Sequence, residues 1–390
     1  MSHSGRHASR PPGDQTRSPS ERARALRASR RISPRTRLVL TGLLLAGLAA
    51  LLLTTVRPPA DGTGGLTAIA ETTTGTTTGT ATGRAGFDLQ GHRGARGLEP
   101  ENTLPAFATA LALGVTTLEL DVGLTLDGQV VVSHDPSLAA DLTRDAAGKW
   151  LVEPTPPIRE LTLAELKSYD LGRVRPDSRA ARRFPRQQPR DGARFPTLAE
   201  LFALAEARSR GTIRYNIETK ITPNSPASPD PESLVTALLK VIDRAGVAAR
   251  VTIQSFDWRS LQQVQSRAPG IPTVYLTVAQ SWMNNLEGGQ AGASAWLAGF
   301  DRDAQASVPA LVKAAGGQIW SPYWKELSSD ELKQAQALGL KVVVWTVNAP
   351  DAMARLIDLG VDGIITDYPD RLRAVMAEKA LPLPTAFPGP

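Results

Sequence analysis

From Phe87 onward, short apolar runs that end in polar residues alternate with longer amphipathic stretches. A short apolar run with polar ends is typical of a buried strand, and a longer amphipathic stretch is typical of a surface helix. Strands that alternate with helices predict βα units around a parallel sheet. We therefore expect an α/β fold for residues 86–380, whose number fits one (β/α)8 TIM barrel with insertions.

Nine segments have the character of strands, one more than an eight-stranded barrel needs, and the sequence does not identify which of them lies outside the closed sheet. A tight turn is predicted at Asp127-Gly128, and it leaves no room for a crossover helix. The predicted strands are 88–92, 117–122, 130–134, 213–220, 251–256, 272–277, 318–323, 341–348 and 363–367. The predicted helices are 103–113, 197–207, 232–245, 258–267, 308–315, 330–338 and 350–359.

Two long segments interrupt the alternation. Residues 137–195 are rich in Pro and Arg, contain one predicted helix at 162–169, and follow His134 directly. Residues 280–306 form the second insertion. Because a segment that follows a barrel strand emerges at the catalytic face, both insertions are expected to form walls or a lid there.

The N-terminal region differs in composition from the predicted barrel. Residues 38–56 carry no charge and are long enough to span a bilayer as one helix. We favour an uncleaved anchor over a cleaved signal peptide, whose apolar core is shorter. Residues 1–37 then form a basic, disordered cytoplasmic tail, residues 57–85 a flexible Thr/Gly-rich linker, and residues 381–390 a Pro-rich C-terminal tail.

The position of the positive charge bears on both topology and partners. The ten arginines of residues 1–37 give that tail a net charge of +8, so the remainder of this +6 chain carries −2. A barrel with that charge gives no support to nucleic-acid binding. Because positive charge favours the cytoplasmic side, the basic tail is expected in the cytoplasm and the barrel outside it. The barrel is then anchored on the extracytoplasmic side or, alternatively, secreted after signal cleavage. Cysteine is absent, which excludes disulfides and thiolate metal sites.

Candidate acid–base residues are few. The predicted barrel contains only two histidines, His92 and His134, and each stands at the end of a predicted strand. A general acid and a general base that work near neutral pH are most often histidines. Because active sites of α/β barrels are assembled at the C-terminal ends of the strands, we expect this pair to be catalytic.

Three carboxylates suggest a metal site. Glu119 and Asp121 lie two residues apart in a predicted strand and therefore face the same side. A half-exposed antiparallel strand would explain them, but inside a barrel two such anions are costly unless they share a counter-charge. A hard divalent cation supplies that charge, and Glu218 at the end of another strand offers a third oxygen ligand.

Two cations and one aromatic residue complete the candidate site. Arg93 and Lys220 can hold a phosphate, Arg through paired donors and Lys as a point charge. A divalent cation on a phosphoryl oxygen, with an acid and a base on either side, is suited to the cleavage of a phosphate ester. Trp345 either packs against the carbon skeleton of the substrate or belongs to the core or rim of the barrel.

Eight short motifs, taken in the order in which they occur, resemble those of the glycerophosphodiester phosphodiesterase family. The resemblance covers roughly residues 86–378. The resemblance implies a TIM barrel that hydrolyses glycerophosphodiesters to glycerol 3-phosphate and an alcohol. The motifs are Gly91-His92-Arg93-Gly94, Pro100-Glu101-Asn102-Thr103, Glu119-Leu120-Asp121-Val122, Ser133-His134-Asp135, Asn216-Ile217-Glu218-Thr219-Lys220, Gln254-Ser255-Phe256, Trp345-Thr346-Val347-Asn348 and Gly363 to Pro369.

The resemblance also implies a role for each motif residue. It assigns the catalytic pair to His92 and His134, and one divalent cation, Ca²⁺ or Mg²⁺, to the three carboxylates. Arg93 and Lys220 would contact the phosphate, while Glu101 and Asn102 would shape the site. Two alternatives stay open: a phospholipase D-like enzyme that cleaves intact membrane phospholipids, and a non-catalytic barrel that binds phosphate or lipid.

Overall fold

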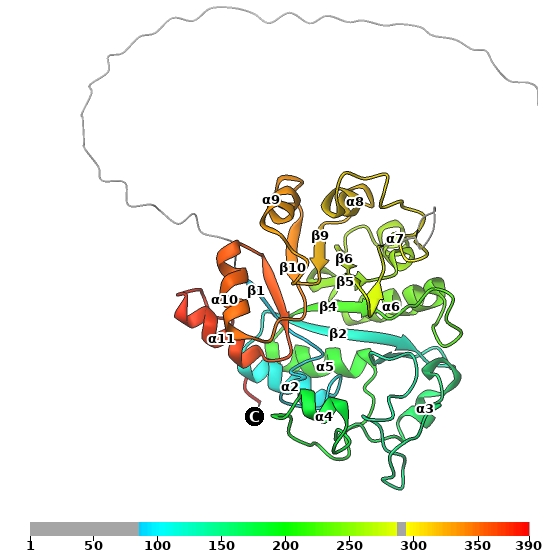
Figure 1. The fold of residues 1–390 in the computed structure, drawn as a ribbon. Coiled ribbons are helices and arrows are strands. Elements are labelled where there is room, and N and C mark those ends of the chain that lie inside the picture. Colours follow the sequence, from blue (N-terminus) through cyan, green and yellow to red (C-terminus); the bar gives the residue numbers. More distant parts are fainter. Residues whose placement is uncertain (1–85, 287–293, 390) are drawn as a thin grey trace, which may run out of the picture. The chain divides into compact units, whose positions relative to one another are not determined.

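The computed structural model describes residues 86–286 and 294–389. Eight parallel strands form a closed barrel, because β1 pairs with β11 on one side and with β2 on the other. This closed sheet confirms the predicted TIM barrel (Figure 1). The strands are β1 (Asp88–Gly91), β2 (Thr117–Leu124), β4 (Arg214–Thr219), β5 (Val251–Ser255), β6 (Thr273–Thr277), β9 (Ile319–Pro322), β10 (Lys341–Val344) and β11 (Gly363–Thr366).

Helices surround the barrel and cover the apolar outer faces of its strands (Figure 1). Six of them begin at a Ser, Thr or Asp whose side chain accepts a hydrogen bond from the first turn. All seven predicted helices are present within two residues at each end, and α11 was not predicted. The helices are α2 (Leu104–Leu113), α5 (Leu198–Ser209), α6 (Pro231–Ala245), α7 (Trp258–Arg267), α8 (Val308–Ala314), α9 (Ser329–Ala337), α10 (Pro350–Leu359) and α11 (Pro369–Glu378).

The strand outside the barrel is β3 (Val130–Val132). It runs antiparallel to β2 in a hairpin that turns at Asp127-Gly128, and the backbone N–H of Ser133 donates to the Asp121 carbonyl. The expectation that His134 follows a barrel strand is therefore wrong. The C-terminal end of β2 extends beyond the barrel, and β3 runs antiparallel to this end. His134 follows β3 and therefore reaches the barrel mouth from outside the closed sheet.

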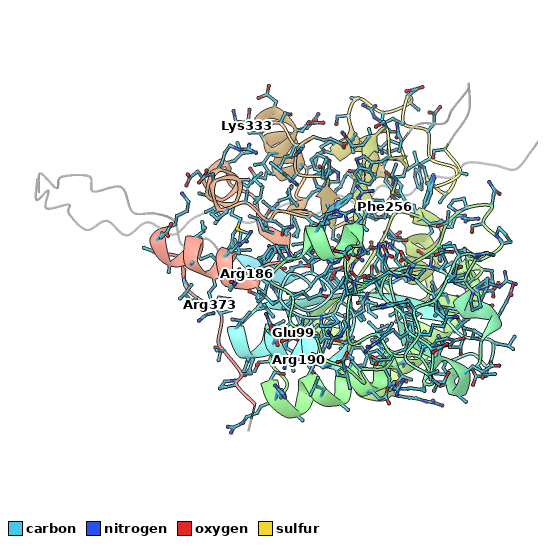
Figure 2. All side chains as sticks on the ribbon, turned by 60° about the horizontal axis from the view of Figure 1, so that its bottom comes forward. Glu99, Arg186, Arg190, Phe256, Lys333 and Arg373 are labelled. Atoms are coloured by element: carbon cyan, nitrogen blue, oxygen red, sulfur yellow. The ribbon has the colours of Figure 1, made fainter. Side chains whose placement is uncertain are left out.

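The first insertion folds against the loop between β1 and α2. It contains α3 (Leu163–Leu166), shorter than the predicted helix, and α4 (Arg179–Arg183), which was not predicted. Arg190 donates two hydrogen bonds to the Glu99 carboxylate, at 2.6 and 2.7 Å (Figure 2). Because this pair joins the insertion to the β1–α2 loop, the insertion forms one wall of the barrel mouth.

The second insertion carries a short hairpin, β7 (Ala279–Gln280) and β8 (Met283–Asn284). The predicted membrane-spanning segment, residues 38–56, lies outside the described residues. Within residues 86–286 and 294–389, no helix has both the length and the apolar character needed to cross a membrane.

Candidate active site

The turn after β1 fixes the first two site residues. A Cβ atom at Gly91 would collide with the Gly94 carbonyl oxygen, and one at Gly94 would lie 2.6 Å from the Ala106 carbonyl carbon. Gly94 also has a φ of +85°, a conformation that side chains with a Cβ rarely adopt. The two glycines therefore allow a turn tight enough to hold His92 and Arg93 against the start of α2.

The three predicted ligand residues meet inside the barrel mouth. One carboxylate oxygen from each of Glu119, Asp121 and Glu218 lies within 4.8 Å of the other two. All three side chains are buried, and the Oδ1 atom of Asp121 has no hydrogen-bond partner. Burial and mutual repulsion raise the pKa of Glu119 well above its usual value and that of Glu218 to about 7. A cation bound here would relieve that repulsion, so the residues fit a divalent metal ion.

Amide side chains and a backbone N–H orient these carboxylates. Gln254 Nε2 donates to Glu119 Oε1 at 2.7 Å, and the backbone N–H of Arg93 donates to Glu119 Oε2 at 2.9 Å. Asn102 Nδ2 donates to Asp121 Oδ2 at 3.1 Å. Neutral groups thus orient the carboxylates of Glu119 and Asp121 without neutralising their charge.

Arg93 and Lys220 flank the carboxylates. Lys220 Nζ lies 2.7 Å from Glu218 Oε1 and 3.8 Å from Asp121 Oδ1. Arg93 Nε lies 3.3 Å from Asp121 Oδ2, and its Nη1 donates to Glu101 Oε1 at 2.6 Å. Burial alone would lower the pKa of Lys220, but the two carboxylates raise it, so the lysine is a cation at neutral pH.

Glu101 serves mainly to hold two arginines. Its Oε1 accepts from Arg93 and its Oε2 forms an ion pair with Arg96. Burial opposes ionisation of Glu101, but the two arginines hold its pKa below the usual value. Glu101 therefore faces the site as the counter-charge that fixes Arg93.

His92 is held by a second buried carboxylate. Its Nδ1 lies 2.6 Å from Asp367 Oδ1, and Asn348 Nδ2 donates to the other oxygen of Asp367 at 2.6 Å. Burial opposes ionisation of Asp367, but His92 and Arg96 keep its pKa well below the usual range. Burial also lowers the pKa of His92, although Asp367 opposes that shift. The pair favours the tautomer with its proton on Nδ1, which leaves Nε2 to face Glu119 at 4.0 Å.

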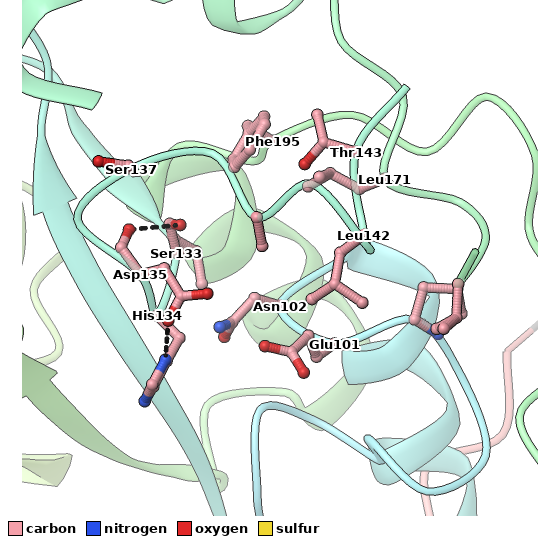
Figure 3. A pocket seen from close by; sticks show the side chains of 14 residues that line it. Glu101, Asn102, Ser133, His134, Asp135, Ser137, Leu142, Thr143, Leu171 and Phe195 are labelled. Atoms are coloured by element: carbon pink, nitrogen blue, oxygen red, sulfur yellow. Dashed lines mark hydrogen bonds and ion pairs between the residues drawn. The ribbon is translucent and has the colours of Figure 1, made fainter. Parts of the chain in front are cut away.

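His134 forms a similar but more open pair. Its Nδ1 lies 2.6 Å from Asp135 Oδ1, and their side chains are 30% and 47% exposed. Burial, Arg93 and Lys220 lower the pKa of His134. His134 lines a pocket together with Glu101, Asn102 and apolar side chains of the first insertion, such as Leu142 (Figure 3). This pocket leaves His134 accessible from the barrel mouth.

Trp345 lies on the opposite side of the mouth. Its ring packs against Phe256 and Tyr323, with centroid separations of 5.2 and 5.5 Å. Trp345 Nε1 donates to the Ser321 carbonyl at 2.9 Å. The Trp345 side chain is half-buried. This position is compatible with both interpretations from the sequence, a rim aromatic and a substrate contact.

Comparison with known proteins decides the family. Residues 92–371 match the Glycerophosphoryl diester phosphodiesterase family. The chain belongs to this family. It is a phosphodiesterase that acts on glycerophosphodiesters, which confirms the enzyme class and reaction expected from the sequence motifs.

Relatives and solved structures agree with this membership. The chain is 30% identical to the glycerophosphodiester phosphodiesterase of Bacillus subtilis, over 73% of this chain and 84% of that protein. It is 36% identical to a putative glycerophosphoryl diester phosphodiesterase from Silicibacter pomeroyi, with a TM-score of 0.68 over 76% of this chain and 95% of that one. An Oleispira antarctica phosphodiesterase, solved with the product sn-glycerol-3-phosphate, shares the fold at 20% identity and a TM-score of 0.53, over 74% of this chain and 96% of that one.

Every residue predicted for the site of this phosphodiesterase lies at the barrel mouth, although the individual roles stay predictions. The residues that position them were given no individual role, although three of the family motifs contain them. Asp367 and Asn348 follow β11 and β10, and Gln254 lies in β5, so each is a polar residue at or near the C-terminal end of a barrel strand. This placement and the motifs were the available sequence indications. They did not reveal which histidine or carboxylate each residue would contact.

Proposed function

We propose that this phosphodiesterase releases glycerol 3-phosphate with His92 and His134 as its acid–base pair and one divalent cation, Ca²⁺ or Mg²⁺, on Glu119, Asp121 and Glu218. The observation that carries the proposal is the convergence of two His–Asp pairs, three carboxylates and two cations at one barrel mouth. When bound, the divalent cation would polarise a phosphoryl oxygen and neutralise charge that develops on the phosphate.

The phosphate is bound by Arg93 and Lys220. Arg93 offers planar paired donors and Lys220 a compact charge, and each lies next to a different carboxylate oxygen of Asp121. Both are fixed by carboxylates before substrate arrives. Pre-oriented donors of this kind stabilise the extra negative charge of the transition state without a further cost of reorganisation.

The two histidines move the protons. With Nδ1–H held by its aspartate, each neutral imidazole has a lone pair on Nε2 that can accept a proton. One histidine takes the proton of the nucleophile, which is water or the 2-hydroxyl of the glycerol. The other, as imidazolium, gives a proton to the oxygen of the leaving alcohol. Attack by the 2-hydroxyl forms a cyclic phosphate first, which water then opens.

We further propose that residues 38–56 anchor the chain in a membrane with the barrel on the extracytoplasmic side. The uncharged run and the basic tail before it support this topology. Extraction of membranes at high pH should leave the full chain in the pellet, and protease added to intact cells should cleave the barrel. Recovery of the full-length chain in the soluble fraction would contradict the anchor.

The function is tested by release of glycerol 3-phosphate from glycerophosphocholine and glycerophosphoethanolamine by the full chain. EDTA should abolish release, and Ca²⁺ or Mg²⁺ should restore it. Lys220→Ala should lower kcat/KM strongly, whereas Lys333→Ala, which removes an exposed lysine on α9, should not (Figure 2). Absence of release from both diesters, with the protein folded and the metal ion present, would contradict the proposal.

A further inference from the structure

Three aromatic side chains form a patch at the barrel mouth, here called the aromatic wall: Trp282, Tyr323 and Trp345. Trp282, in the turn of the β7–β8 hairpin, is 60% exposed. Its ring centroid lies 5.7 Å from that of Tyr323 and 6.3 Å from that of Trp345, and both pairs are nearly perpendicular. The chain thus places a large apolar residue in solvent next to two half-buried rings.

The aromatic wall is continuous with the candidate active site. Trp345 packs edge-to-face on Phe256, and Lys220 Nζ lies 5.9 Å from the centroid of the Phe256 ring. The same Lys220 forms its ion pair with Glu218. A phosphate bound by Lys220 therefore has Phe256, labelled in Figure 2, and then the aromatic wall on one side of it.

The rings of the aromatic wall carry no cation of their own. Elsewhere the faces of aromatic rings are occupied: Trp324 has Lys325 and Arg355 over it, and Trp150 has Arg144 and Arg175. Within the part of the chain that the structure describes, no lysine or arginine stands over Trp282, Tyr323 or Trp345. No cation of the described chain therefore competes with a ligand cation for these rings, which contact one another in edge-to-face and tilted pairs.

A carboxylate lies at the base of the hairpin that carries Trp282. Glu326 Oε1 accepts hydrogen bonds from the backbone N–H of Ala279 and from Gln280 Nε2, at 3.0 and 2.6 Å. Glu326 holds the hairpin beside the mouth and adds negative charge there. The Nε1 donor of Trp345 is already engaged by the Ser321 carbonyl, so its ring offers a face rather than a hydrogen bond.

We propose that the aromatic wall binds the alcohol head group of a glycerophosphodiester that carries a quaternary ammonium, as in glycerophosphocholine. A quaternary ammonium has no N–H to donate, and ring faces attract it through their negative quadrupole. A primary ammonium needs acceptors for its three N–H groups, and a sugar or glycerol head group needs partners for its hydroxyls. The inference deepens the proposed function and rests on it.

The test compares kcat/KM for glycerophosphocholine with kcat/KM for glycerophosphoethanolamine in the full chain. The ratio should favour choline, and Trp282→Leu should lower it about fivefold, whereas Trp282→Phe should retain most of it. Leucine keeps the apolar contact but removes the ring face. Trp150→Leu, the same change in the first insertion, is the matched control and should leave the ratio as it is.

Two results would overturn the inference. A ratio that survives Trp282→Leu would assign the aromatic wall to apolar packing alone. An equal loss of kcat/KM for both diesters would assign Trp282 to the support of the hairpin.

Calorimetry with phosphocholine and phosphoethanolamine separates this inference from the reaction, because it needs no turnover. The wild type should bind phosphocholine more tightly, and Trp282→Leu should reduce that difference. Equal binding of the two probes by the wild type would overturn the inference even if hydrolysis is confirmed. Preferential binding of phosphocholine without any hydrolysis of the diesters would instead contradict the proposed function and support the assignment of the aromatic wall as a subsite.

Discussion

The barrel mouth has two halves of different character. One half, at the ends of β1, β2, β3, β4 and β11, consists of charged side chains that are paired with one another and, apart from the His134–Asp135 pair, buried. The other half, at β5, β9, β10 and the β7–β8 hairpin, consists of aromatic rings, one of them largely in solvent. A buried charge is strongly constrained by its partners, whereas an exposed ring is not. The difference suggests that chemistry resides in the first half and choice of substrate in the second.

The largest effect is expected in the charged half. His92→Ala and His134→Ala should each lower kcat by about 10²–10⁴, because each removes a proton-transfer group. Initial rates of glycerol 3-phosphate release, with thermal melting to verify folding, would measure this. If kcat falls by less than about tenfold in either variant, the assignment of the acid–base chemistry to the charged half is contradicted.

Substitution of the aspartates separates the two His–Asp pairs. Asp367→Asn should lower kcat by about a hundredfold, because an amide that donates to Nδ1 favours the wrong tautomer of His92. Asp135→Asn should cost less, since the Asp135 side chain is 47% exposed and water can replace it, whereas Asp367 is fully buried. A pH–rate profile of both variants would show whether the shape of the curve changes or only its height. Equal losses in the two variants would indicate that burial does not distinguish the pairs.

Cation binding should depend on pH. Because burial raises the pKa of Glu218 to about 7, this carboxyl holds a proton in much of the cation-free protein at pH 6 and must lose it to bind a cation. The apparent affinity for Ca²⁺ or Mg²⁺ should therefore rise as pH increases through 7, by about tenfold between pH 6 and 8, with release of protons. Calorimetry in buffers of different ionisation enthalpy would measure the release. Affinity that is independent of pH would contradict the raised pKa.

The smallest effect is expected in the aromatic half. Trp345→Leu should raise KM severalfold and change kcat little, because packing against bound substrate contributes about equally to the ground state and the transition state. Steady-state kinetics with glycerophosphocholine would separate the two constants. A large fall in kcat would instead show that Trp345 contributes to the chemistry that is assigned to the charged half.

Much of the barrel was predictable because its periodicity is local. The helices begin at capping side chains such as Thr103 and Thr197 and end where the apolar pattern ends, which the sequence displays directly. The helix α11 was missed although Pro369 marks its first turn and its buried positions, Leu372, Val375 and Met376, have helical spacing. The odd strand was not identified, although the tight turn predicted at Asp127-Gly128 was a signal for it: two strands without a crossover helix between them pair antiparallel, as β2 and β3 do.

The candidate site was predictable for a different reason. Its charged residues stand at strand ends, and parallel strands bring those ends to one face. Contacts between residues far apart in sequence were not predictable: the sequence does not indicate that Asp367 contacts His92 or that Gln254 contacts Glu119. The sequence pattern also did not predict how His134 reaches the barrel mouth, because this depends on how far β2 extends past the barrel.

The contact between His92 and Asp367 has a consequence for synthesis of the chain. The two residues are 275 positions apart, and the backbone N–H of His92 also donates to the Thr366 carbonyl. At ribosomal rates of about 5–20 residues per second, β1 waits roughly tens of seconds for β11 to be made. A nascent or prematurely terminated chain that stops before Gly363 contains both histidines and all three carboxylates, yet it has an open barrel and a mispositioned imidazole. The carboxylate that holds the imidazole of His92 is thus among the last parts of the barrel to be made.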